Sequence, residues 1–247
     1  MKLSKNLYFV WFVLAMVIFT ACSDKDDDPQ PSNNQQNSES PELQTVSVFI
    51  PDEMAQSDNP GAMQAVNYIS IANSFTGFAA AITPPKSSPV FKSGLDGPWV
   101  HSWTFDDGTD LYTVTLTITE NSDGYSWDMV ITGTLGGNVL ENFTYMEAWQ
   151  NQAGTSGSFA MYDPEGSGEM MQVSWNTSES GVYTCTFEMP QDMIIEIISN
   201  PDGSGEVTVN EWYEGAYELT FEAQWDATGH GEYWEYYEGE IVDHGTW

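Results

Sequence analysis

The sequence of 247 residues contains very few positive charges. Lysine and arginine together number five against 37 aspartates and glutamates, which gives a formal net charge of -32. All five are lysines, and none follows Lys92. Nucleic-acid binding requires a basic surface that replaces phosphate counterions, so the composition excludes this class of function. A lysine or arginine clamp for phosphoryl transfer is also excluded beyond Lys92.

Cysteine is equally scarce, because Cys22 and Cys185 are the only two in the chain. Cys185 falls on the apolar face of an expected strand, and no cation or histidine stands in that strand to activate its thiol. An unbroken apolar run, Leu7–Phe19, is shorter than the roughly 20 residues that cross a bilayer. Hydrophobic residues nevertheless make up 40% of the chain, which is enough for the core of one domain or two small ones.

Residues 1–21 have the organisation of a signal peptide. Lys2 and Lys5 precede the apolar run, and small residues follow it. The sequence FTAC at 19–22 resembles a bacterial lipobox, which implies cleavage after Ala21 and lipidation of Cys22 by acyl chains such as palmitate. An uncleaved anchor or an ordinary secretory signal is the alternative. If Cys22 carries lipid, no intramolecular disulfide can form.

The acidic stretch that follows the lipobox indicates where the protein is located. It resembles the export signal of uncharacterised Bacteroidota surface lipoproteins and comprises Ser23, Asp24, Lys25, Asp26, Asp27 and Asp28. The resemblance implies a lipoprotein of the outer membrane that faces the exterior, with the membrane as a partner through its lipid anchor. Alternatively, these acids only solvate a linker. Residues 22–44 are polar and proline-containing, which predicts a disordered acidic tether.

We expect a single folded domain over residues 45–247, beginning with one helix. Asn59 and Pro60 form a typical N-cap and first helical position, and apolar residues then recur at helical spacing. The pattern predicts a helix over about 60–82. Because this stretch is mostly apolar and uncharged, we expect it to pack on a sheet or inside a barrel.

From about residue 98 onward the apolar residues alternate with polar ones. In one stretch Tyr112, Val114, Leu116 and Ile118 alternate with threonines, which is typical of a half-buried strand. Turn dipeptides such as Asp107-Gly108 separate ten to twelve such segments. The fold class is therefore mainly β: an antiparallel β-meander over about 98–247, barrel-like or strongly curved because strand twist accumulates.

An internal repeat supports copied hairpins. Residues 163–169, followed by Trp175, match residues 200–206, followed by Trp212, and a weaker third copy begins at Gly229. The third copy, GHGEYWEYYEGEIVDHGTW, resembles MORN-type hairpin repeats, a likeness that brings no function with it. The spacing predicts one hairpin unit repeated with changes in turn length.

The two C-terminal hairpins contain the candidate site residues. A two-residue turn at Glu214-Gly215 would place Glu211 opposite Glu218 on the outward face, with Trp212, Tyr217, Leu219 and Phe221 on the core face. Opposed carboxylates are compatible with a bound calcium ion, with a proton-sharing acid/base pair as in glycosidases, or with simple solvation.

The last hairpin, with its turn at Glu238-Gly239, predicts a ligand-binding face. In this register Tyr237 pairs with Glu240, Trp234 with Asp243 and Tyr233 with His244, and Trp234, Tyr236 and Ile241 point inward. The expected outward residues are Tyr233, Glu235, Tyr237, Glu240 and His244. Aromatic rings stack on sugar faces and carboxylates accept hydroxyl hydrogen bonds, so this face predicts glycan binding; cross-strand packing without a ligand is the alternative.

We expect no metal site and no cofactor. Calcium ligands could come from the loop residues Asp106, Asp107 and Asp110, or from Glu211 and Glu218, but the loop lacks EF-hand spacing. The predicted register places His230 opposite Trp247 and on the other face from His244, which argues against a transition-metal site. His101 is expected to be a hydrogen-bonded core histidine.

No complete catalytic set stands in the sequence, so we do not expect an enzyme. The predicted function is that of a surface-anchored binding or accessory β-domain, with a glycan or a surface protein as its partner. Two alternatives stay open: a glycoside hydrolase-like enzyme that uses the paired glutamates, and a purely structural surface protein.

Overall fold

The computed structural model describes residues 40–44, 47–81, 84, 90–92, 97–166 and 168–247. The predicted signal peptide, the lipobox with Ala21 and Cys22, and the export signal over residues 23–28 lie outside the described residues. The tether over 22–44 does so as far as residue 39.

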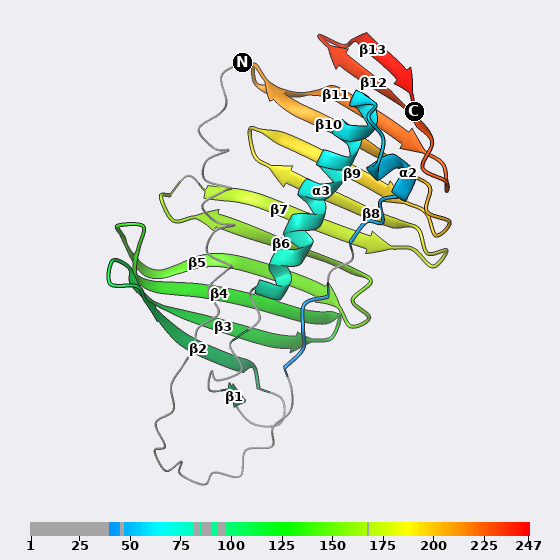
Figure 1. Ribbon diagram of the computed structural model, residues 1–247. Helices are drawn as coiled ribbons and strands as arrows, with labels where there is room; N and C mark the ends of the chain where they lie inside the picture. The colour runs from blue at the N-terminus through cyan, green and yellow to red at the C-terminus, as the bar shows by residue number, and fades with distance from the viewer. Residues whose placement is uncertain (1–39, 45–46, 82–83, 85–89, 93–96, 167) are drawn as a thin grey trace. The chain divides into compact units, whose positions relative to one another are not determined.

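In the described part of the chain, thirteen strands form one antiparallel sheet in which every strand pairs with its neighbours in sequence (Figure 1). Their bounds are β1 Val90–Lys92, β2 Trp99–Asp106, β3 Leu111–Asn121, β4 Gly124–Leu135, β5 Asn138–Asn151, β6 Ser156–Asp163, β7 Gly168–Thr177, β8 Tyr183–Met189, β9 Met193–Ser199, β10 Gly205–Tyr213, β11 Ala216–Trp225, β12 Gly231–Tyr237 and β13 Glu240–Thr246.

The predicted antiparallel meander is confirmed, and the sheet is strongly curved but open. Strands β2–β13 fall in the region predicted to hold ten to twelve strands, and the three-residue strand β1 precedes it. Alternation explains the core: Val114, Leu116 and Ile118 of β3 are buried, whereas the threonines between them are partly exposed.

Two helices precede the sheet, α2 (Asp52–Ala55) and α3 (Pro60–Ala81). The Asn59 side-chain oxygen accepts hydrogen bonds from the backbone N–H groups of Gly61 and Ala62, as an N-cap should. Helix α3 contacts β9, β10, β11 and β12 and lies across one side of the sheet (Figure 1). The prediction of a helix over about 60–82 that packs on the sheet is confirmed.

We call the side of the sheet that α3 covers the helix face and the opposite side the outer face. The helix face contains Val207, Phe221 and Tyr233, which are 0%, 0% and 6% exposed. The Tyr68 ring of α3 lies 5.5 Å from the Phe221 ring, and a Cβ on Gly61 would collide with Tyr233. The core between helix and sheet is therefore tightly packed.

The folded domain begins before the predicted Thr45. Gln150 is 3% exposed, its side-chain oxygen accepts a hydrogen bond from the Gln44 N–H at 2.8 Å, and its amide donates to the Glu42 carbonyl at 3.1 Å. Further along, the Asn73 side chain of α3 bonds both the N–H and the carbonyl of Val48, at 2.7 and 2.9 Å. These hydrogen bonds satisfy the buried amide of Gln150 and the half-buried amide of Asn73.

A β-bulge changes the faces of the β10–β11 hairpin. The predicted pairs Glu211–Glu218 and Trp212–Tyr217 are confirmed, but the register then shifts between Val209 and Asn210. One extra residue reverses the alternation that was expected to continue to Phe221. Trp212 is consequently 38% exposed while Phe221 is fully buried, so the prediction that they share the core face is wrong.

A second bulge shifts the last hairpin. The pair Tyr237–Glu240 is confirmed, but a shift between Glu235 and Tyr236 gives Trp234 opposite His244 instead of Asp243. Tyr233 pairs with Gly245 instead of the predicted His244, and it points into the core. The predicted register beyond the bulge is wrong by one residue. The predicted inward and outward side chains of β12 are also exchanged, because Tyr233 pairs with the buried Ala223 of β11 and therefore points to the helix face.

The structure corrects the predicted repeat as well. The first copy leads into β7 and the second into β10, with β8 and β9 between them, so β7 and β10 run in opposite directions. Their tryptophans are not equivalent, because Trp175 is 4% exposed and Trp212 is 38% exposed. The repeat that the structure does contain is a glycine facing a tryptophan on the paired strand, at Gly157–Trp175, Gly205–Trp225 and Gly231–Trp247.

His101 is a core residue at 4% exposure, as predicted, but not a hydrogen-bonded one. Among the described residues neither ring nitrogen has a hydrogen-bond partner. Burial lowers the pKa of His101, because the low-dielectric core disfavours the charged ring.

Candidate binding groove on the outer face

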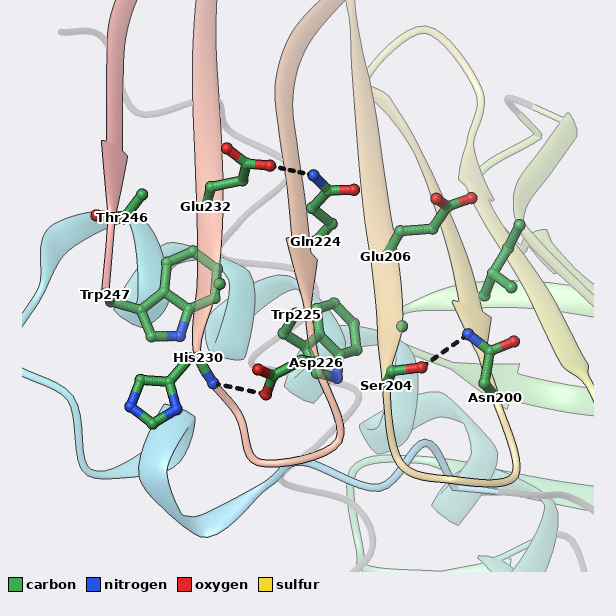
Figure 2. Close-up of a pocket in the computed structure, with 13 residues that line it drawn as sticks. Asn200, Ser204, Glu206, Gln224, Trp225, Asp226, His230, Glu232, Thr246 and Trp247 are labelled. Atoms are coloured by element: carbon green, nitrogen blue, oxygen red, sulfur yellow. Dashed lines mark hydrogen bonds between the residues drawn. The ribbon is translucent and has the colours of Figure 1, made fainter.

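A pocket of about 790 Å³ opens on the outer face, where strands β9 to β13 approach their turns (Figure 2). It is lined by two rows of side chains and the backbone between them. The lining residues are Ile198, Asn200, Ser204, Gly205, Glu206, Gln224, Trp225, Asp226, His230, Gly231, Glu232, Thr246 and Trp247. We call this site the outer groove.

The first row crosses all five strands at one register level. Glu206 pairs with Ile198 on one side and with Gln224 on the other, Gln224 pairs with Glu232, and Glu232 pairs with Thr246. Directly paired residues point to the same face, so these side chains stand side by side (Figure 2). The Gln224 amide donates a hydrogen bond to the Glu232 carboxylate.

The second row lies two residues closer to the turns and is tied into them. The Asn200 amide donates to the Ser204 hydroxyl at 3.0 Å, and Asp226 accepts hydrogen bonds from Thr228 and from the His230 N–H. The His230 Nε2 lies 3.3 Å from a carboxylate oxygen of Glu53 in α2. These bonds hold the row in place as a rigid margin of the groove.

Glycine and tryptophan alternate along the floor between the two rows. Gly205 pairs with Trp225, Trp225 pairs with Gly231, and Gly231 exchanges backbone hydrogen bonds with Trp247. The indole N–H of Trp225 donates to the Gly203 carbonyl at 3.1 Å, and that of Trp247 donates to the Gly229 carbonyl at 2.6 Å. Because a ring occupies the place of each missing glycine side chain on the helix face, the outer groove has a floor of bare backbone.

Aromatic residues stand beside the first row. The Trp234 and His244 rings are stacked, with centroids 5.1 Å apart and planes at 10°, and His244 Nε2 lies 3.6 Å from a Glu232 carboxylate oxygen. The Tyr236 hydroxyl donates a hydrogen bond to the Glu222 carboxylate, which raises the pKa of Tyr236 to about 12. The outer face also holds three side chains that lie two residues from the first row, on the side away from the turns: Trp234, His244 and Glu222.

The charge of the outer groove is negative. Glu206, Asp226 and Glu232 are acidic, and the lining contains neither lysine nor arginine. Hydrogen bonds from the Thr228 hydroxyl and from nearby backbone N–H groups lower the pKa of Asp226, because they favour its ionised form. Such a groove repels anionic ligands and offers hydrogen-bond acceptors to hydroxyl groups.

The structure does not bring the five predicted ligand-binding residues together. Tyr233 is buried on the helix face, where its hydroxyl donates to Asp243 at 3.0 Å. Glu235 is half-buried, whereas Tyr237 and Glu240 are exposed near the turn of the last hairpin. Only His244 stands beside the outer groove.

Sequence reasoning missed most of the groove. Trp234 and Tyr236 were expected to point inward, and the first-row residues Ile198, Glu206, Gln224 and Thr246 were not singled out. The signal that could have located the floor is the recurrence of Gly-x-Gly-Glu at 203–206 and 229–232, each followed by a hairpin that ends in tryptophan.

The paired glutamates lie at the other end of β10 and β11, and the prediction that they point outward is wrong. Glu211 alternates with the buried Val207 and Val209, so it shares the helix face with its partner Glu218, and its carboxylate acts on Tyr68 of α3. Burial raises the pKa of Glu211, and the second cause is the Asp192 carboxylate. Asp192 lies in the β8–β9 turn, so the carboxylate that acts on Glu211 is not that of Glu218. A proton-sharing pair would require Glu218 to raise the pKa of Glu211. Glu218 borders a separate pocket of about 410 Å³ with Glu238.

The acidic loop before β3 binds its own backbone. Asp107 accepts hydrogen bonds from the N–H groups of Asp110 and Thr109, which lower the pKa of Asp107, and Asp106 accepts one from Gly108. Within the described ranges no group of three or more histidine, cysteine or acidic side chains is placed to hold a metal ion.

Comparisons with protein-family models, with curated proteins and with solved structures give no match for this chain. Of the helices in the described part of the chain, none has the length and apolar character needed to cross a membrane.

Proposed function

We propose that this protein is a lipid-anchored protein of the outer cell surface whose β-domain binds an uncharged glycan in the outer groove without catalysing a reaction. The observation that supports glycan binding is the combination of carboxylate, amide and hydroxyl side chains in one row with the Trp234–His244 stack beside it. Carboxylates and amides bind sugar hydroxyls, and an indole face packs against the apolar face of a sugar ring.

Charge selects among glycans. The chain has a net charge of -32 and the lining has no cation, so uronic-acid or sulfated glycans are repelled. An uncharged glycan satisfies the acceptors of Glu206, Gln224 and Glu232 through its own hydroxyl donors. A preference for uncharged glycans distinguishes this proposal from non-specific electrostatic binding, which would favour cationic ligands of any shape.

Binding of the purified full-length protein to immobilised neutral polysaccharides tests the proposal. Glu206→Gln and Trp234→Ala should each weaken retention on the gel that retards the wild type. Glu196→Gln, also on the outer face of these strands, and Trp212→Ala, another partly exposed tryptophan, are the matched controls outside the lining. Loss of binding in the controls as well, or no retardation by any glycan, would remove the glycan proposal.

The anchor needs its own test, because it is inferred from the sequence around Cys22. Incorporation of labelled palmitate should be present in the wild-type protein and absent from Cys22→Ala. Equal labelling of both proteins would remove the lipid anchor from the proposal and leave the groove unaffected.

A hydrolase that uses Glu211 and Glu218 is the second candidate. The observations that favour it are the opposed position of the two carboxylates and the raised pKa of Glu211. The hydrolase candidate is weakened because the carboxylate that acts on Glu211 is that of Asp192, which is not part of the Glu211–Glu218 pair. Release of reducing sugar from a bound glycan, abolished in Glu211→Gln and retained in Glu206→Gln, would favour the hydrolase.

A further inference from the structure

The outer groove is elongated in one direction, across the strands. The first row, the floor and the second row each run from strand to strand, so the groove lies across β9–β13 and perpendicular to the strands (Figure 2). Neighbouring strands are about 4.8 Å apart, and the four intervals between five strands give the groove a length of about 19 Å.

The chemistry repeats along that direction. At each of four strands the floor is flanked by one side chain of the first row and one of the second, which stands just beyond the end of the strand. These pairs are Ile198 and Asn200 at β9, Glu206 and Ser204 at β10, Gln224 and Asp226 at β11, and Glu232 and His230 at β12. The sheet therefore offers two polar side chains at each of β10, β11 and β12, and one, Asn200, at β9, where Ile198 adds an apolar contact. A ligand of the size of one sugar ring would use only one of these four positions.

The floor allows a long ligand to lie flat. The Cβ directions of Gly205 and Gly231 point to the helix face, where Trp225 and Trp247 fill the space, so no side chain rises from the floor. All lining residues belong to the floor or to the two rows, and none of them crosses the groove. A polymer can consequently occupy the groove through internal units, without presenting a chain end.

We infer that the ligand of the outer groove is an extended stretch of an uncharged glycan, about four units long, which lies across the strands with one unit against Trp234 and His244. This inference rests on the proposed function and specifies its ligand class. Recognition is distributed over the row Glu206, Gln224 and Glu232, so affinity grows with chain length until the groove is filled.

Calorimetric titration of the full-length protein with neutral oligosaccharides of one to six units tests this inference, using gluco-, xylo- and manno-configured series. We expect the affinity for one series to rise about tenfold or more between two and four units and then to level off. In Glu206→Gln the gain from the third and fourth units should fall, whereas Glu196→Gln should reproduce the wild-type length profile.

The outcomes separate the two levels of the proposal. Equal affinity for one unit and for six would overturn the extended ligand and leave glycan binding in place. No heat with any series, together with no retention on polysaccharide gels, would overturn the proposed function itself. A length profile that is identical in Glu206→Gln and in the wild type would place the extended ligand on another surface and overturn the inference. Unchanged near-ultraviolet circular dichroism of Glu206→Gln serves as the folding control.

Discussion

Gly205 tests the claim that the floor of the outer groove depends on glycine–tryptophan pairs. A Cβ at Gly205 would lie 2.5 Å from the Ile198 carbonyl oxygen and 2.5 Å from Cζ2 of Trp225. Both neighbours are fixed, because the carbonyl belongs to the β9 backbone and Trp225 is 4% exposed. The substitution Gly205→Ala therefore has to displace a strand or a buried indole.

The expected magnitude follows from these two contacts. Overpacking of a tight site costs about 1–3 kcal/mol. Displacement of the Trp225 ring also weakens its hydrogen bond to the Gly203 carbonyl, which contributes about 0.5–1.5 kcal/mol. The unfolded chain has less conformational entropy with alanine than with glycine at this position, which offsets about 0.4–1 kcal/mol of the loss. We expect Gly205→Ala to lower the free energy of unfolding by about 1–3 kcal/mol.

Urea denaturation followed by tryptophan fluorescence measures this change. Glu206→Ala is the matched control, because its side chain is exposed one residue away and its effect should stay within about 0.5 kcal/mol. Equal unfolding midpoints for Gly205→Ala, Glu206→Ala and the wild type would refute the reasoning, since the floor would then tolerate a side chain.

Three further predictions concern other parts of the domain. Gln150→Ala removes both hydrogen bonds to residues 42–44, so it should lower the free energy of unfolding by about 1–3 kcal/mol and expose that segment to limited proteolysis. Burial lowers the pKa of His101 in the folded state, so the unfolded chain binds more protons near pH 6. In urea titrations, acidification from pH 7 should therefore lower the free energy of unfolding of the wild type more than that of His101→Leu. Equal pH profiles of the two proteins would contradict this. The hydrogen bond from the Tyr162 hydroxyl to Glu147, 2.6 Å long, raises the pKa of Tyr162 to about 12, and NMR titration of labelled tyrosine in Glu147→Gln should show a value nearer 10.

The local patterns in the sequence predicted most of the fold. Alternation in β3 and the short turns were sufficient for the antiparallel meander, and the Asn59–Pro60 cap located the start of α3 within one residue. These features depend on interactions between residues that are close in sequence. A single chain without long connections between its strands leaves little freedom of topology.

The faces of the last strands could not be predicted in the same way. The extra residues Thr220 and Val242 at the two bulges are ordinary strand residues, and each shifts every side chain beyond it to the other side. Helix α3 covers Phe221, which lies beyond the Thr220 bulge, and Tyr233, which reaches the same face because it pairs with Ala223 of β11. These contacts join segments more than 150 residues apart, and the local pattern does not contain them.

The exchanged faces of β12 explain why the candidate site was only partly predicted. The idea of aromatic rings beside carboxylates was based on Tyr233 and Tyr237, whereas the structure gives this arrangement to Trp234 and Tyr236. The row of Glu206, Gln224 and Glu232 joins three strands through their registers. The Gly-x-Gly-Glu recurrence marks Glu206 and Glu232, but only the registers show that Gln224 stands between them.

The most direct test of glycan binding in the outer groove is a titration of the nitrogen-15-labelled protein with a neutral tetrasaccharide from the series that binds, followed through the indole N–H signals. The signals of Trp234 and Trp247 should shift, because the Trp234 ring stands beside the first row and the Trp247 ring packs directly beneath the floor at Gly231. The signal of Trp175, whose indole bonds the Gly154 carbonyl on a different hairpin, should stay in place. Shifts confined to Trp175, or unchanged signals for all three tryptophans at saturating ligand, would contradict the assignment of this groove as a glycan-binding site.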